Sequence, residues 1–441
     1  MIAMSGVRAW SEELNRAGLT MPGVVERSRV IASMPTLSLL TLAALTPRDI
    51  EVEYHEIKDL RTEGMPERKF DLVAIASQSA QIHDAYAVAK HFRAQGAAVV
   101  MGGLHVTAMP EEALEYASAI VVGEAEAVWP RLVEDCREGR LAPRYQQDID
   151  EEFDLARAPL PRYDLLDPEK YNRLLVQTSR GCPHRCEFCA SSILLTRRYK
   201  SKPVERVIAE VRAIREVWSE PFIELADDNS FVDKKYGHRL CHALMNEGVK
   251  WFTETDISIA EDSGLLDKMR AAGCRQVLIG LESPSAGGLD GIEGRRNWKL
   301  RQHSRYEQAV LEIQSRGITV DGCFILGLDG DTEAAFDEIA AFAERTGLYD
   351  VQITVLTPFP GTPLYDRLLR EGRIIEPGAW HKCTLFDVNF VPGGMTPECL
   401  QSGLLELAQR LYQPERVAKR RERFMGLLRE RSLRAPFESE C

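Results

Sequence analysis

The chain has 441 residues, of which 44% are hydrophobic and 28% are charged. A chain of this length is usually divided into two or three domains, each with its own hydrophobic core. The proportion of hydrophobic to charged residues excludes collagen, coiled-coil and low-complexity classes. The 55 Lys and Arg residues against 67 Asp and Glu residues give a formal charge of −12, which argues against a nucleic-acid partner. Because no apolar run has signal-peptide or membrane-spanning length, we expect a cytoplasmic protein without a transmembrane segment.

The first 140 residues alternate short strand-like runs with helical ones. Strands are predicted at residues 1–7, 50–57, 71–77, 97–102 and 119–123, with helices at 80–94 and 125–137 between them. Such alternation predicts an α/β domain with a doubly wound parallel sheet over residues 1–140. Ligands of these sheets bind beyond the strand C-termini, where this chain has polar and small residues: Ser77, Ser79, Gly102, Gly103, His105, Gly123 and Glu124.

A second alternating series follows a segment rich in Pro, Asp and Arg at residues 141–172, which we interpret as a linker. Strands are predicted at 174–178, 222–226, 251–255, 276–281, 319–326 and 351–357, and helices at 204–218, 234–246, 264–272, 306–316 and 333–345. This series predicts a partial (β/α)6 barrel over residues 173–362, with its chemistry at the strand C-termini. Residues 363–441 are predicted to form a mostly helical extension.

Three clustered cysteines follow the first barrel strand. Cys182, Cys186 and Cys189 have the spacing C-x3-C-x2-C, whereas the other seven cysteines are scattered. Three thiolates on one loop can hold a 4Fe-4S cluster and leave one iron open to a cofactor or substrate. The alternatives are a zinc site completed by His184, which lacks the usual second cysteine pair, and unrelated buried thiols.

The cysteine motif, with Phe188 before its last cysteine and its place after the first barrel strand, resembles the radical S-adenosylmethionine (SAM) superfamily. The resemblance implies that the three cysteines are catalytic ligands of a 4Fe-4S cluster, that the open iron binds SAM, and that reduction by an external donor such as flavodoxin or ferredoxin yields a 5′-deoxyadenosyl radical. It also implies SAM contacts from Phe188 and from the ends of the next three strands: Asp227, Asp228, Asn229, Glu254, Asp256, Glu282 and Ser283. A single carboxylate at a strand end is more often a helix cap or a solvated loop group, but three in register behind the cysteine triad favour cofactor contacts.

The chain as a whole resembles the radical SAM branch with an N-terminal cobalamin-binding-type domain, which contains hopanoid methylases and anaerobic tetrapyrrole cyclases. The segments that carry this resemblance are residues 34–40, 102–107, 122–126 and 357–365. The resemblance implies cobalamin at the seven strand-end residues of the first domain. Small residues there allow a bulky cofactor close to the backbone. The Asp-x-His-x-x-Gly motif that supplies a cobalt ligand is absent, and His105 is more typical of a hydrogen-bonding residue than of a ligand.

Three functions compete. The first is cobalamin-dependent radical methylation of an unactivated carbon, and the second is cobalamin-independent radical cyclisation, oxidation or carbon–carbon bond formation with the first domain as a lid. The third is a non-catalytic iron–sulfur protein. A small-molecule or lipid substrate is expected, and the basic residues 414–436 are either a membrane-surface helix or a solvated helix packed by one edge. Cys323 is either a donor to a substrate radical or a buried inert thiol.

Overall fold

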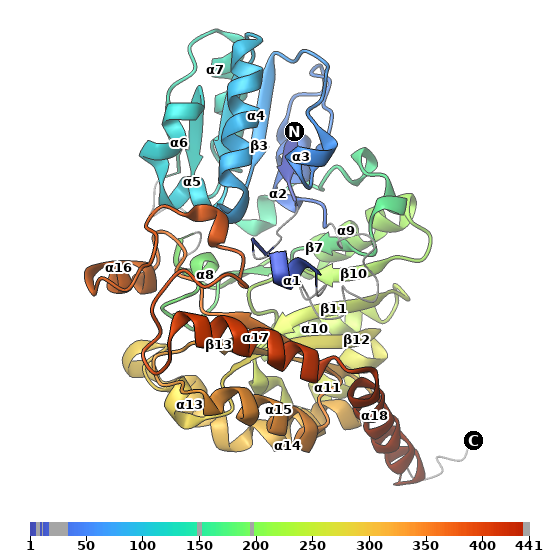
Figure 1. Cartoon of the computed structure of the whole chain (residues 1–441). Coiled ribbons are helices and arrows are strands. Elements are labelled where there is room, and N and C mark those ends of the chain that lie inside the picture. Colours follow the sequence, from blue (N-terminus) through green and yellow to red (C-terminus); the bar gives the residue numbers. More distant parts are fainter. Residues whose placement is uncertain (6–8, 11, 17–33, 148–151, 195–197, 435–441) are drawn as a thin grey trace, which may run out of the picture.

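The computed structural model describes residues 1–5, 9–10, 12–16, 34–147, 152–194 and 198–434 (Figure 1). Within them, two six-stranded parallel sheets form the centres of two domains. Figure 1 shows the first sheet with its helices above the second. No helix among the described residues combines the length and the apolar character needed to cross a membrane.

The first sheet has the strand order β2-β1-β3-β4-β5-β6. Its strands are β1 (Ile2–Met4), β2 (His55–Ile57), β3 (Leu72–Ala76), β4 (Ala98–Gly102), β5 (Ala119–Val122) and β6 (Arg144–Gln146). The helices of this domain are α2 (Leu37–Leu45), α3 (Leu60–Glu63), α4 (Ile82–Ala94), α5 (Leu104–Ala108), α6 (Pro110–Tyr116) and α7 (Trp129–Arg137).

Alternate residues of β3 explain why helices cover both faces of this sheet. Val73 and Ile75 pack with α4 and α6 in one apolar cluster, whereas Ala74 packs with α2 and α7 in another. The period of two along the strand therefore separates two cores, as a doubly wound sheet requires.

The second sheet has the order β14-β13-β12-β11-β10-β7, and its two outer strands do not pair with each other, so the barrel is partial. Its strands are β7 (Leu174–Val176), β10 (Phe222–Leu225), β11 (Lys250–Thr255), β12 (Cys274–Glu282), β13 (Thr319–Leu326) and β14 (Asp350–Val355). The main helices that cover it are α9 (Val204–Val217), α10 (Lys234–Leu244), α11 (Ser263–Ala271), α14 (Tyr306–Ser315) and α15 (Ala334–Thr346).

Shorter elements lie around the mouth of the barrel. They are the antiparallel pair β8 (Ser179–Arg180) and β9 (Lys200–Ser201), with the helices α1 (Glu12–Arg16), α8 (Ala190–Leu194), α12 (Ala286–Leu289) and α13 (Trp298–Gln302). The chain then continues through α16 (Pro363–Arg370), α17 (Pro397–Leu411) and α18 (Pro414–Arg434). Helix α17 packs against α15 and β14.

The predicted fold class is confirmed, with two differences in detail. Strand β6 lies inside the segment predicted as a linker, because a three-residue edge strand is too short to give a period in the sequence. The predicted first and second strands are shorter in the structure, and residues 6 and 7 of the first lie outside the described part. On α18, Arg420 and Phe424 are buried, which agrees with a helix packed by one edge.

Candidate functional site

The cysteine loop leaves β8 at Gly181, whose φ of 86° is one that residues with a side chain rarely adopt. Cys186 is buried, and Cys182 and Cys189 are half-buried. The N–H of Cys189 donates to the carbonyl of Cys186 at 3.0 Å, and the backbone of Glu187 bonds to Ile292 and Leu364. The segment after α12 and the first turn of α16 therefore hold the loop from two sides.

The environment of the thiols fits a metal cluster. Burial raises the pKa of Cys182 to about 11 and raises that of Cys186 well above its usual range, so a nearby cationic centre is needed to stabilise the thiolates. Among the described residues, no set of three or more His, Cys, Asp and Glu side chains is arranged around one metal ion. A four-iron cluster does not require its ligands to converge on one metal ion, because each thiolate binds a different iron.

The position of His184 argues against the zinc alternative. Its Nε2 lies 3.3 Å from Asp256 and its Nδ1 lies 3.3 Å from Glu293, so both ring nitrogens already have carboxylate partners. Burial opposes the charged form of His184, but the two hydrogen bonds outweigh it and raise the pKa. With both ring nitrogens held by carboxylates, His184 has no nitrogen left to complete a zinc site with the cysteines.

The polar residues at the end of β10 lie against the cysteine loop. Asp227 is buried and accepts bonds from the N–H groups of Thr178 and Ser179 at 2.7 and 2.8 Å. Asp228 accepts a bond from the N–H of Gly181 at 2.9 Å and also from Ser191. Asp227 therefore fixes the strand that leads into the loop, whereas the side chain of Asp228 holds the first turn of the loop itself.

The next predicted residues divide between two environments. Asn229 donates to Asp256 at 2.8 Å, and its amide nitrogen lies 3.9 Å from the sulfur of Cys182. Glu254 lines a cavity, and its carboxylate has no hydrogen-bond partner in the part of the chain that the structure describes. Burial, followed by the charges of Glu224 and Asp228, raises the pKa of Glu254 to about 8. Its carboxyl group is therefore largely protonated at neutral pH.

The fourth strand end carries a buried ion pair. Glu282 contacts Nζ of Lys299 at 2.7 Å, and Ser283 bonds to the N–H of Ser285 at 3.2 Å. Phe188 is half-buried against the main core. Sequence reasoning missed Lys299, because a lysine in a basic segment resembles a solvated residue.

Cys323 on β13 lies among the groups of the barrel interior. The charges of Glu282, Asp321 and Glu254 all act on it, and burial raises the pKa of its thiol well above the usual range. Cys323 therefore stays a protonated thiol on the inner side of the barrel. Its predicted role as a donor to a substrate radical stays a prediction.

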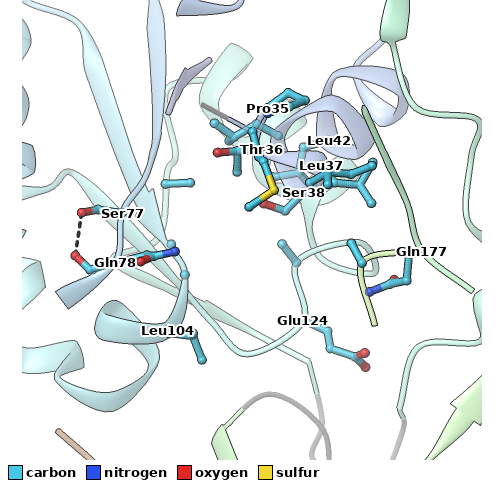
Figure 2. Close-up of a pocket in the computed structure, with 18 of the residues that line it drawn as sticks. Pro35, Thr36, Leu37, Ser38, Leu42, Ser77, Gln78, Leu104, Glu124 and Gln177 are labelled. Atoms are coloured by element: carbon cyan, nitrogen blue, oxygen red, sulfur yellow. Dashed lines mark hydrogen bonds between the residues drawn. The ribbon is translucent and has the colours of Figure 1, made fainter. Parts of the chain in front are cut away.

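A cavity of about 670 Å³ separates the carboxyl edges of the two sheets. Figure 2 shows Pro35, Thr36 and Leu37 near one side of it, with Ser77 and Gln78 on another. Of the residues predicted from sequence, eight line this cavity: Ser77, Gly102, Gly103, Gly123, Glu124, Asp227, Asp228 and Glu254. Sequence reasoning did not assign Arg173, Gln177, Arg180 and Glu224, which line it from the barrel side.

Gly103 shows why the cavity wall requires glycine. Its φ is 109°, and a Cβ there would lie 3.0 Å from the carbonyl oxygen of Ser77. A side chain would be strained and would crowd the neighbouring strand end, so the backbone forms this part of the wall.

His105 and Ser79, which were predicted to contact a cofactor, do not line this cavity. His105 is completely buried, and its ring bonds to Ser79 at 3.0 Å and to Glu112 at 3.4 Å. Burial lowers the pKa of His105, so the ring is neutral. All nine histidines of the sequence lie in the described part of the chain, and none lines the cavity.

Glu124 forms a link between the two domains. It contacts Arg180 at 2.6 Å and Lys200 at 2.7 Å, and Arg180 also contacts Glu126 at 2.7 Å. The side chains of Glu124, Glu126 and Arg180 are at most 17% exposed, so solvent screens this network only weakly. Since Arg180 lies two residues before Cys182, the end of β5 is attached directly to the cysteine loop.

Comparisons with known proteins agree with this arrangement. The model of the radical SAM superfamily matches residues 176–343, that of the B12 binding domain matches 30–133, and a domain of unknown function matches 362–440. The chain is a radical SAM enzyme with a B12-binding domain. The predicted resemblance is thus confirmed.

The similar proteins span most of this chain. Bacteriochlorophyllide d C-12(1)-methyltransferase of Chlorobaculum tepidum is 26% identical over 88% of this chain and 84% of its own length. Hopanoid C-2 methylase of Rhodopseudomonas palustris is 26% identical over 89% and 73%. The structure of the radical SAM methyltransferase TsrM from Kitasatospora setae, with cobalamin and a [4Fe-4S] cluster bound, is 17% identical, has a TM-score of 0.67 and matches over 88% of each chain. That likeness establishes the common fold.

Proposed function

We propose that this chain is a cobalamin-dependent radical SAM methyltransferase that methylates an unactivated carbon. The observation that carries the proposal is a cavity lined both by the strand ends of the B12-binding domain and by Asp228 and Glu254 of the barrel. Two cofactors bound at these two edges would face each other across the space where a substrate can enter. The named methyltransferases among the relatives support the same reaction class.

The iron–sulfur centre is assigned to Cys182, Cys186 and Cys189. When bound, a 4Fe-4S cluster supplies one electron to SAM and so generates the 5′-deoxyadenosyl radical. The loop contributes one buried and two half-buried thiols, and Asn229 directs an N–H toward the sulfur of Cys182. Hydrogen bonds to ligating sulfurs tune such centres. The electron is expected from an external donor protein such as flavodoxin or ferredoxin.

The SAM contacts are assigned to the strand ends around the loop. Asp228 lines the cavity and holds Gly181, which supports its assignment as an acceptor for the SAM amine. Glu254, neutral at physiological pH, can both donate and accept a hydrogen bond. Asp227 and Asp256 hold the neighbouring backbone and His184, so we assign them to positioning. Phe188, Glu282 and Ser283 stay candidates on the other side of the loop.

Cobalamin is assigned to the opposite wall, with no histidine on cobalt. Ser77, Gly102, Gly103 and Gly123 line that wall with the segment 34–39, and the absence of histidine from the described lining fits a cobalt without an imidazole ligand from the protein. We assign Glu124 to the link with Arg180 instead of a cofactor contact. We assign His105 and Ser79 to hydrogen bonds that stabilise the interior of the first domain.

A second candidate is radical cyclisation or oxidation without methyl transfer. Anaerobic magnesium-protoporphyrin IX monomethyl ester cyclase of Cereibacter sphaeroides is 27% identical over 69% of this chain, although the match spans 53% of that protein. In this case the first domain would act mainly as a cover over the cavity. The products of the reaction distinguish the two candidates.

The test is anaerobic reconstitution with iron, sulfide and cobalamin, followed by turnover in an extract that contains the substrate. We expect S-adenosylhomocysteine and 5′-deoxyadenosine in equal amounts and a product heavier by one methylene group. The Cys186→Ala variant should lose deoxyadenosine, whereas Cys241→Ala, which changes a buried thiol on α10, should keep it. Deoxyadenosine with a product of unchanged carbon count would favour the second candidate.

A further inference from the structure

Exposed arginines lie on and beside the cysteine loop. Arg185 belongs to the loop itself, and Arg295, Arg296 and Arg301 belong to a segment that packs against it. The guanidinium group of Arg296 donates to the carbonyl oxygen of Pro183 at 3.1 Å, and that of Arg301 donates to the carbonyl oxygen of Arg296. We call these four arginines the arginine patch. Two of its members are thus tied, directly or through one residue, to the backbone of the loop.

Other contacts fix the same segment against the loop. The N–H of Glu187 donates to the carbonyl oxygen of Ile292 at 2.9 Å. The rings of His184 and Trp298 have their centroids 4.2 Å apart, and the same histidine contacts Glu293 at 3.3 Å. The arginine patch therefore forms part of the protein surface at the loop that carries the three thiols.

The positive charge of the patch is not neutralised by its neighbours. No carboxylate among the described residues forms an ion pair with Arg295, Arg296 or Arg301. The carboxylates of the two segments have other partners: Glu187 with Arg367 at 2.6 Å, Glu293 with His184 at 3.3 Å and Asp290 with the amide of Asn297 at 2.7 Å. Because the whole chain carries a net charge of −12, an acidic protein is repelled by the chain as a whole and attracted locally to this patch.

The position of the patch favours an electron donor over other anionic partners. Electron transfer slows steeply with distance, and this surface lies on the loop of the proposed cluster ligands. No member of the patch lines the cavity between the two sheets. A protein docked here would therefore approach the cluster from outside and leave the proposed cofactor and substrate sites accessible.

We propose that the arginine patch is the docking surface for a small acidic electron-transfer protein of the flavodoxin type. This inference rests on the proposed function and adds to it the place where the donor binds. In the step, the reduced donor loses one electron and the cluster gains it, and no bond forms or breaks. Electron-transfer complexes have small interfaces, so charge pairing should dominate the affinity and make it dependent on salt.

The test compares the wild type with the double variant Arg295→Glu, Arg301→Glu, using flavodoxin as the probe. Binding of oxidised flavodoxin, which has no electron to donate, is measured by calorimetry at low ionic strength. We expect Kd to rise at least about tenfold, and the rate constant for cluster reduction by reduced flavodoxin in stopped flow to fall by a similar factor. Both differences should shrink at 1 M salt, where the Debye length is about 3 Å.

The matched control is Lys419→Glu, Arg429→Glu, which makes the same change in net charge at two exposed residues of α18. Figure 1 shows α18 on the opposite side of the barrel domain from α13. This variant should bind flavodoxin more tightly than the patch variant and close to the wild type. Photoreduced deazariboflavin, a small uncharged reductant, should reduce the cluster at the same rate in all three proteins.

Equal effects of the two double variants on flavodoxin binding, or no effect of either, would overturn the inference. The same holds if the wild type binds neither flavodoxin nor an acidic ferredoxin. If the patch variant loses its cluster, Arg295→Gln, Arg301→Gln decides by the same comparison, with a smaller change of the same sign expected. A wild-type chain that takes up no iron would instead overturn the proposed function.

Discussion

Glu254→Gln tests the electrostatics of the barrel interior. The pKa of Glu254 is raised to about 8 by burial and by Glu224 and Asp228, against partial opposition from Arg173. In the unfolded chain it is about 4.3. Between these values the folded chain holds a proton that the unfolded chain releases, so stability falls as pH rises, by about 1.4 kcal/mol per pH unit. Glutamine cannot ionise, so the variant lacks this contribution.

The free energy of barrel opening can be read from hydrogen exchange of the peptide that contains β11, measured by mass spectrometry at increasing urea. Between pH 5 and pH 7, the opening free energy of the Glu254→Gln variant should rise by about 2.7 kcal/mol relative to that of the wild type. Other titrating groups contribute equally to both proteins and cancel in this difference. A difference that stays constant over the same pH range would refute the assigned protonation of Glu254.

Three further variants test the link and the cavity wall. Arg180→Met leaves Glu126 without its cation and Glu124 with Lys200 alone, so the unfolding free energy measured in urea should fall by up to about 3–5 kcal/mol, and changing Glu126 to Gln as well should recover part of it. His105→Gln should bind cobalamin with unchanged optical and paramagnetic resonance spectra, and an altered cobalt spectrum would contradict its placement away from the cavity. Gly103→Ala should weaken cobalamin binding about tenfold in equilibrium dialysis, because the backbone strain of about 1–3 kcal/mol would distort the cavity wall at this residue. Unchanged binding would contradict the assigned site.

Much of the architecture could be predicted because the chain repeats a simple pattern. Parallel strands buried on both faces leave continuous apolar runs, and β3, β4 and β13 were all predicted within a residue or two of their ends. Strand β6 was missed because its residues, Arg-Tyr-Gln, bury only Tyr145. Its pairing with β5 is a long-range contact that leaves no local signal.

The candidate site was predictable where a motif places residues on one loop, as for Cys182 and Cys186. The residues predicted at strand ends lie at the C-terminal edge of each sheet, but the side chains that they contact could not be predicted. His105 follows the glycines of β4 in sequence, yet its side chain turns into the core toward Ser79 and Glu112. Lys299 reaches the end of β12 from α13, a helix that the sequence pattern did not predict.

The link between Arg180 and Glu124 explains how the two proposed cofactor sites keep their spacing. Glu124 directly follows Gly123, which lines the cobalamin wall, and Arg180 precedes the cysteine loop, so one buried ion pair joins the two walls at their rims. A second contact, from Lys200 on β9 to the same carboxylate, resists rotation about the first. Methyl transfer between two bound groups requires that their separation change little while the substrate enters. The domains of this chain therefore meet through a buried polar link, and the cavity lies beside this link between the two sheets.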